Sequence, residues 1–174
     1  GVSFIAGQRG RNIRFYTEHI NEKGYFGLSS FLKTGNLFGL QYIYGTLTNS
    51  GGADPLDFDA FMKSPMEYWL VATDAQTGKP TYFSKKDMHK DDYRHVMASC
   101  AIPAACRPVE IDGRFYYDGG VSDSIPVQKA IDDGCDKLVI ILTKPHDFVK
   151  EPERDRFIYK RLCRKYPKII EALD

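Results

Sequence analysis

The 174-residue sequence lacks several patterns by which common protein classes are identified. No apolar run approaches the ~20 residues that a membrane-spanning helix needs. Charge of one sign is also lacking, because 24 Lys and Arg residues face 23 Asp and Glu residues and leave a formal net charge of +1. The phosphate-binding patterns Gly-x-Gly-x-x-Gly and Gly-x-x-x-x-Gly-Lys do not occur. These absences argue against a membrane-spanning protein, a nucleic-acid partner and a nucleotide-binding domain.

Cysteine and histidine are few and dispersed. No Cys-x-x-Cys pair occurs, and no two histidines have the spacing of metal ligands. The cysteines are therefore expected to be reduced structural thiols, which favours a cytoplasmic location. The residues concerned are Cys100, Cys106, Cys135, Cys163, His19, His89, His95 and His146.

The sequence does have the composition of an ordinary globular protein, with 43% hydrophobic and 27% charged residues. Its length fits one domain, residues 1–174, with a substantial core. Strand patterns at 67–73, 81–83, 109–111 and 114–117 alternate with helical patterns near 2–6, 57–62, 93–100, 126–133 and 153–172. The apolar run 137–142 is typical of a strand buried on both faces by helices. Together these patterns predict an α/β domain with a mostly parallel central sheet flanked by helices.

Glycine and aromatic residues are concentrated between Gly24 and Gly52. Regular periodicity is poor there, so short helices and loops packed by aromatic side chains are expected. Such an excursion from an α/β domain often forms one wall of a pocket, and a compact surface insertion is an equal alternative. The stretch from Tyr25 to Tyr44 is therefore a candidate for part of an apolar groove.

Asp118-Gly119-Gly120 is the most informative tripeptide. A short strand pattern at 114–117 delivers the carboxylate to the end of a strand, and two glycines then free the backbone to turn sharply. A helix start with Pro126 in its first turn follows. Taken alone, an Asp-Gly pair is usually a turn in which the aspartate binds its own backbone. The residues around it favour a functional site.

Several segments resemble the patatin-like phospholipase family in order and spacing. They are Ala98-Ser99-Cys100-Ala101-Ile102-Pro103, then Pro108-Val109, then 113–121 with its Asp-Gly-Gly, then Ile125-Pro126-Val127 and Gly134-Cys135-Asp136. Upstream, 69–74 with Thr77-Gly78 resembles the strand and loop that precede this block in the family, and 7–12 is similar to bacterial members. The resemblance spans nearly the whole chain.

The resemblance implies a three-layer patatin-like domain that hydrolyses carboxylic esters of phospholipids or related lipids with a serine–aspartate dyad. A serine in a Gly-x-Ser-x-Gly elbow attacks the ester carbonyl, and the aspartate of Asp-Gly-Gly takes its proton. Asp118 matches that general base. No metal or organic cofactor is implied. The implied partners are a lipid or acyl-ester substrate and, transiently, a membrane surface.

The serine elbow is what the sequence does not contain. Gly1-Val2-Ser3-Phe4-Ile5 begins like one, but Ile5 stands where the second glycine is required and would crowd the tight turn. A better alignment places 2–8 toward the end of the helix that follows the elbow. We therefore expect Ser3 to be a helix residue, the nucleophilic serine to lie upstream of Gly1, and the domain to be N-terminally incomplete. The alternative is a non-catalytic lipid-binding or interaction module of the same fold.

Overall fold

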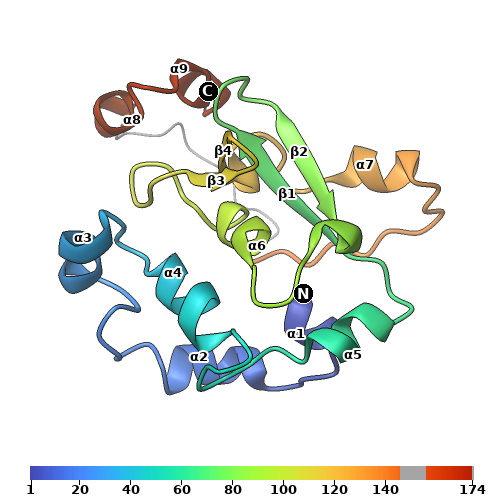
Figure 1. The fold of residues 1–174 in the computed structure, drawn as a ribbon. Coiled ribbons are helices and arrows are strands. Elements are labelled where there is room, and N and C mark those ends of the chain that lie inside the picture. The colour runs from blue at the N-terminus through green and yellow to red at the C-terminus, as the bar shows by residue number, and fades with distance from the viewer. Residues whose placement is uncertain (146–155, 174) are drawn as a thin grey trace.

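The central element of the computed structural model is a four-stranded sheet with the order β2-β1-β4-β3 (Figure 1). The structure describes residues 1–145 and 156–173. The strands are β1 (Trp69–Asp74), β2 (Pro80–Ser84), β3 (Val109–Ile111) and β4 (Arg114–Asp118). All three neighbouring pairs are antiparallel. The α/β class is thus confirmed, but the prediction of a mostly parallel sheet is wrong for the described residues.

Two tight turns explain the antiparallel pairing. Between β1 and β2, the carboxylate of Asp74 accepts hydrogen bonds from the backbone N–H groups of Gln76 and Thr77, both at 2.9 Å. Between β3 and β4, Asp112 and Gly113 have φ angles of +50° and +78°. Positive φ at both central residues is the geometry of a type I′ hairpin, which Asp-Gly favours. Strands joined by such short turns pair antiparallel, because a parallel pair needs a crossover connection.

Short helices surround the sheet, as Figure 1 shows. Helix α6 packs on β1, β3 and β4, and it buries Val96, Met97 and Ala98. The helices are α1 (Val2–Ile5), α2 (Arg11–Thr17), α3 (Leu28–Thr34), α4 (Leu40–Tyr42), the π-helix η1 (Ile43–Leu47), α5 (Phe58–Lys63), the 3-10 helix η2 (Lys85–Asp87), α6 (Arg94–Ala98), the 3-10 helix η3 (Gly119–Val121), α7 (Val127–Asp132), α8 (Arg156–Leu162) and α9 (Pro167–Ala172).

Several helix predictions are confirmed. Helix α1 and helix α5 lie where the sequence indicates, and Asp57 caps α5 by accepting a hydrogen bond from Ala60 N at 2.9 Å. Helix α7 follows Pro126 and is succeeded by Gly134 with a φ of +89°. The C-terminal helix is broken near Pro167 into α8 and α9, and the first residues of that prediction, 153–155, lie outside the described residues. None of the helices in the described ranges is both long and apolar enough to cross a bilayer.

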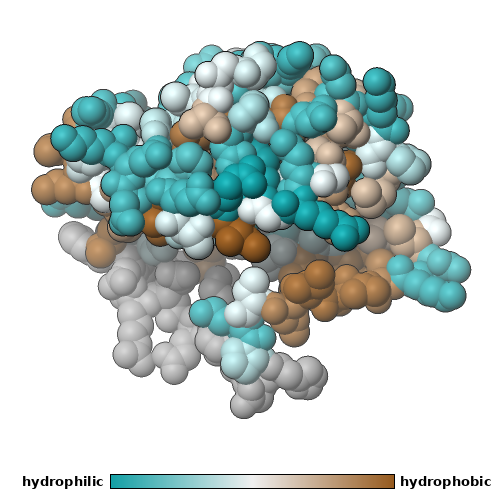
Figure 2. Space-filling model, turned by 90° about the horizontal axis from the view of Figure 1, so that it is seen from below, coloured by the Kyte–Doolittle hydropathy of each residue, from teal (hydrophilic) through white to brown (hydrophobic). Residues whose placement is uncertain are grey.

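The prediction of a buried strand at residues 137–142 is wrong. The described backbone there forms no strand, and Val139 and Ile141 are 91% and 89% exposed. In Figure 2 an apolar arm projects below the body of the molecule where the trace of this segment runs in Figure 1. A continuous apolar run becomes a buried strand only when neighbouring strands and helices cover it. No described strand pairs with this segment, so its side chains stay in solvent.

Candidate active site

Asp118 lies at the junction of strand β4 and the 3-10 helix η3. Its backbone is fixed on both sides, because its N–H donates to Ala101 O at 2.9 Å and its C=O accepts from Thr73 Oγ1 at 2.8 Å. The carboxylate caps η3 by accepting a hydrogen bond from Gly120 N at 2.7 Å. The aspartate predicted from the sequence therefore does lie at a strand end, in a rigid backbone frame.

The two glycines after Asp118 have different roles. Gly119 is buried against β1, and a Cβ atom there would lie 2.4 Å from Val71 O, so only glycine fits. At Gly120 a Cβ atom would lie 3.0 Å from Asp118 Oδ1. A side chain at Gly120 would crowd the carboxylate, whereas glycine leaves it accessible. Glycine is therefore required at position 119 by the nearby backbone of β1, and at position 120 it keeps space open beside the Asp118 carboxylate.

Burial sets the acidity of this carboxyl group. Asp118 is half-buried, and desolvation raises its pKa above the ordinary value because burial disfavours the charged form. The hydrogen bond from Gly120 N acts in the opposite direction and partly offsets the shift. In the described part of the chain no Lys, Arg or His forms an ion pair with Asp118. A carboxylate with a raised pKa is a stronger base than a solvated one.

An apolar cavity of about 660 Å³ opens beside Asp118. Asp118 and Gly1 both line it, and most other lining residues are aromatic or aliphatic. Residues from the glycine- and aromatic-rich stretch make up much of the wall: Tyr25, Phe26, Phe38, Leu40, Ile43 and Tyr44. The prediction that this stretch forms a pocket wall is therefore confirmed, and the acyl-chain role remains a prediction.

Tyr44 and Cys100 form the part of the cavity wall that connects to Asp118. The Tyr44 hydroxyl lies 3.6 Å from Cys100 Sγ, and the residue after Cys100 accepts the backbone hydrogen bond of Asp118. Burial raises the pKa of both groups, so the phenol and the thiol stay neutral near pH 7. All four cysteines are unpaired, as expected from their spacing.

Ser3 lies in helix α1 as predicted and also contributes to the cavity wall. Its hydroxyl is already engaged, because it donates to Asn12 Oδ1 at 2.9 Å and accepts from Arg11 Nη1 at 3.0 Å. No described hydrogen bond joins it to Asp118. The structure therefore does not bring Ser3 and Asp118 together as a bonded pair.

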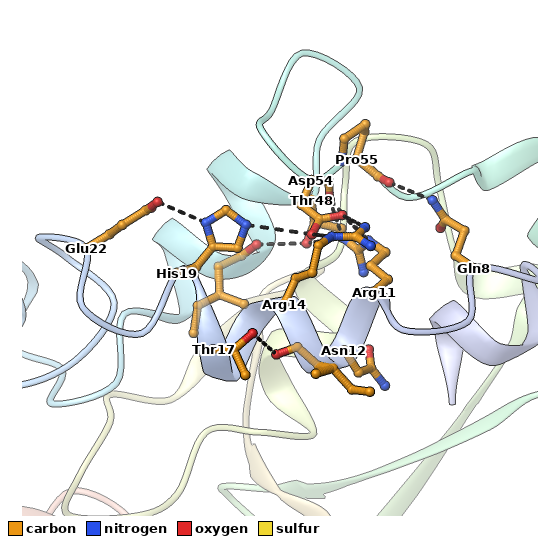
Figure 3. A network of polar contacts seen from close by, with 12 residues as sticks. Gln8, Arg11, Asn12, Arg14, Thr17, His19, Glu22, Thr48, Asp54 and Pro55 are labelled. Atoms are coloured by element: carbon orange, nitrogen blue, oxygen red, sulfur yellow. Dashed lines mark hydrogen bonds and ion pairs between the residues drawn. The ribbon is translucent and has the colours of Figure 1, made fainter.

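Arg11, which donates to Ser3, also belongs to a largely buried charge network around Asp54 (Figure 3). Asp54 accepts a bidentate pair of hydrogen bonds from Arg14, at 2.8 Å from Nε and 2.7 Å from Nη2. Arg11 donates to the backbone C=O of Asp54 and to Thr48 Oγ1. His19 lies 3.7 Å from the same carboxylate. The network joins α1 and α2 to the loop before α5, which fixes one side of the cavity.

Sequence reasoning missed this network. Arg11 and Arg14 have the i, i+3 spacing that places both guanidinium groups on one face of a helix. That spacing was the available signal, but nothing near Asp54 in the sequence indicates that a loop acid would reach them. The pKa of the Asp54 carboxyl lies below its ordinary value, because the arginine contacts outweigh the opposing effect of burial.

Comparison with known proteins adds an independent line of evidence. The family model for patatin-like phospholipase matches residues 2–131, which is most of the chain. The chain is 28% identical over 155 residues to uncharacterized protein YjjU of Escherichia coli (strain K12), covering 87% of this chain and 42% of that protein. It is 37% identical over 68 residues to uncharacterized NTE family protein Rv1063c of Mycobacterium tuberculosis (strain ATCC 25618 / H37Rv), covering 39% of this chain and 18% of that protein.

The chain thus spans less than half the length of each of these two curated relatives. The matched region includes the strand end and turn of Asp118, every residue of the cavity wall except Gly1, and the arginine-containing helix α2. With the match extending over most of its length, the chain belongs to the patatin-like phospholipase family.

Proposed function

We propose that this chain is part of a lipid acyl hydrolase that cleaves carboxylic esters in the manner of a phospholipase A, with Asp118 as the general base of a Ser-Asp dyad. The observation that carries the proposal is a half-buried carboxylate at a strand end, facing an apolar cavity. Family membership supports ester hydrolysis as the reaction class. The location we propose is cytoplasmic.

The geometry of Asp118 suits proton transfer from a hydroxyl. Gly120 N–H binds Oδ1, which orients the carboxylate and leaves Oδ2 for a second partner. In the proposed reaction the serine hydroxyl gives its proton to Asp118 while its oxygen bonds to the ester carbonyl carbon. When the tetrahedral intermediate collapses, the leaving alkoxide takes that proton back. Water then attacks the acyl-enzyme with Asp118 again as base, which releases the fatty acid and regenerates the serine.

We propose that the nucleophilic serine precedes Gly1. Gly1 and Asp118 line the same cavity, so residues just before Gly1 would reach the neighbourhood of the carboxylate. Ser3 is a weaker candidate, because its hydroxyl is held by Asn12 and Arg11 in the wall. A hydroxyl that is fixed by two protein partners must lose both before it can attack a substrate.

The cavity composition supports an acyl chain as the bound group. Removing apolar surface from water is favourable by about 25 cal/mol per Å². Most of the cavity wall consists of aromatic and aliphatic side chains, which can bury the apolar surface of a ligand in this way. Asp118 supplies the polar end of the site. A substrate with one apolar chain and an ester group fits this distribution better than a polar metabolite does.

Fluorophosphonate labelling of the full-length protein tests the position of the nucleophile. We expect stoichiometric labelling of a serine upstream of Gly1, located by peptide mass spectrometry, together with hydrolysis of a nitrophenyl ester. Labelling at Ser3 would contradict the proposed position. A full-length protein that binds lipid but is neither labelled nor hydrolytic would instead be the non-catalytic lipid-binding module.

A further inference from the structure

Helix α3 exposes its apolar side chains and buries only a serine, unlike a helix that packs on a protein core. Leu28 and Leu32 are 70% and 76% exposed, whereas Ser30 is 1% exposed. The hydroxyl of Ser30 has no hydrogen-bond partner among the described residues. A surface helix in water normally buries its leucines and exposes its serines. The outward face of α3 is therefore suited to an apolar environment.

The exposure of α3 is imposed by a well-held loop. Phe26 and Phe38 form a β-bridge, and their rings pack at a centroid distance of 5.0 Å. Gly27 N donates to Leu37 O at 2.9 Å, which closes the loop 26–38 at its base. Leu37 N donates to Ala105 O at 2.8 Å and ties the loop to the segment after α6. Helix α3 is thus held at one edge of the molecule (Figure 1), where Leu28 and Leu32 are exposed.

The exposed apolar surface continues to the mouth of the cavity. Four partly exposed residues line the cavity and are also open to solvent: Tyr16, Ile20, Phe26 and Ile102. Phe26 belongs both to this mouth and to the base of the α3 loop. Apolar surface is also visible in Figure 2 at the edge where Figure 1 places α3. The base of the α3 loop and the cavity mouth thus share an exposed aromatic side chain.

Positive charge flanks the same face. Residues 23–37 include Lys23 and Lys33 and no Asp or Glu. The guanidinium of Arg107 lies against Gly35, where an added Cβ atom would come within 2.4 Å of it. Glu22, which precedes the segment, is engaged by His19 and Tyr42. Exposed leucines beside lysine and arginine are the features of a surface that binds anionic lipid headgroups.

We propose that helix α3, with Phe26 and Leu37 at its base, docks the protein on the surface of an anionic lipid bilayer and places the cavity mouth against the membrane. The proposal rests on the proposed lipid hydrolysis for its biological purpose, but the contact itself can be measured without catalysis. It specifies which face meets the membrane and which residues enter the headgroup region.

A lipid surface fits this face better than a protein partner does. A standard protein interface uses about 20–30 residues on each side, whereas this face presents only a few apolar side chains. Shallow insertion of a few leucines combined with attraction to anionic headgroups is sufficient for reversible membrane binding. The position of this face next to an apolar cavity further favours a lipid partner, because a lipid ligand could enter the cavity directly from the bilayer.

Sedimentation of the full-length protein with phosphatidylcholine vesicles, with and without phosphatidylglycerol, tests the proposal. The double variant Leu28→Ser/Leu32→Ser should lower the vesicle partition coefficient about ten- to hundred-fold, because two leucine side chains that insert partly into the bilayer are lost. Lys33→Gln should lower binding about five-fold, and only to the vesicles that contain phosphatidylglycerol. The matched control is Ile125→Ser/Ile131→Ser, two exposed isoleucines near α7, on the other side of the molecule from α3 in Figure 1.

Unchanged partition of the Leu28/Leu32 variant, or an equal loss in the control, would overturn the proposal. So would a lipid-independent dimer in analytical ultracentrifugation that the Leu28/Leu32 variant dissolves, because the face would then bind a second copy. Hydrolysis of a soluble short-chain ester separates this result from the proposed function. We expect the Leu28/Leu32 variant to hydrolyse that ester at the wild-type rate. If the wild-type protein binds vesicles but has no esterase activity, the proposed function is wrong and the proposed membrane contact through α3 is supported.

Discussion

Asp118→Asn in the full-length protein is expected to separate catalysis from stability. Asparagine has nearly the same shape, and its Oδ1 can still accept the 2.7 Å hydrogen bond from Gly120 N. It cannot take a proton from a serine, so we expect kcat for ester hydrolysis to fall about 10²–10⁴-fold, the usual contribution of a general base. The turn and the cavity should remain in place.

The same substitution should stabilise the fold at neutral pH. Burial raises the pKa of Asp118, so over the pH range between its ordinary and its raised pKa the folded state binds a proton more tightly than the unfolded chain. Wild-type stability therefore falls as pH rises through that range. Asparagine carries no charge to desolvate, so the variant should be more stable above the range and equally stable below it. Wild-type activity should rise with pH through the raised pKa, because only the carboxylate is a base.

Asp118→Ala is the matched control for the hydrogen bond. Alanine removes both the base and the cap of the 3-10 helix η3. Losing a side-chain cap costs about 1 kcal/mol, which corresponds to about 2–4 °C in Tm for a domain of this size. We thus expect both variants to be inactive. At neutral pH the Asp118→Asn variant should melt at a higher temperature than the wild-type protein, and the Asp118→Ala variant should melt at a lower temperature than Asp118→Asn.

Two measurements test the predicted roles of Asp118 in catalysis and in stability. They are the initial rates on a nitrophenyl ester as a function of pH, and the thermal unfolding of all three proteins at acidic and neutral pH. Undiminished hydrolysis by the Asn variant would refute the role of Asp118 as base. An Asn variant that is less stable than wild type at neutral pH would refute the argument from desolvation, whatever its activity.

Three further substitutions test other parts of the structure. Gly119→Ala should cost about 1–3 kcal/mol in urea unfolding and should reduce esterase activity, because its Cβ would overlap Val71 O and displace the turn; unchanged stability would contradict the close approach. Arg11→Leu should lower the free energy of unfolding by about 3 kcal/mol, because it leaves the buried Asp54 without one of its partners. A decrease no larger than that for an exposed ion pair would contradict the structural role of this network. Ser3→Ala should lose about 1–2 kcal/mol with its two hydrogen bonds and keep its kcat; an inactive but folded variant would make Ser3 the nucleophile.

The parts of the fold that sequence predicts well are those determined by local chemistry. The hairpin around Asp112-Gly113 follows from residues that tolerate positive φ. The cap at Asp57 and the turn at Asp74 follow from side chains that bind their own backbone. Asp118 could be placed at a strand end for the same reason, because strand pattern and glycines adjoin in the sequence.

The parts that sequence does not predict depend on contacts between distant segments. A mostly parallel sheet was expected from alternating strands and helices, but strand direction is decided by connections, and short turns impose antiparallel pairs here. The apolar residues 137–142 indicate burial without specifying what would cover them. The pairing of Arg11 and Arg14 with Asp54, some 40 residues away, leaves no local trace.

The apolar arm at residues 137–142 bears on how the 174-residue chain will behave in solution. In the stretch 138–142 the backbone makes no hydrogen bond to another described residue, and the side chains of these five residues are aliphatic and uncharged. Such a segment offers donors and acceptors in register for any passing strand. Turbidity should consequently rise steeply with protein concentration and fall when Ile141 is replaced by lysine, since one charge in the middle of the run interrupts cross-strand stacking between molecules.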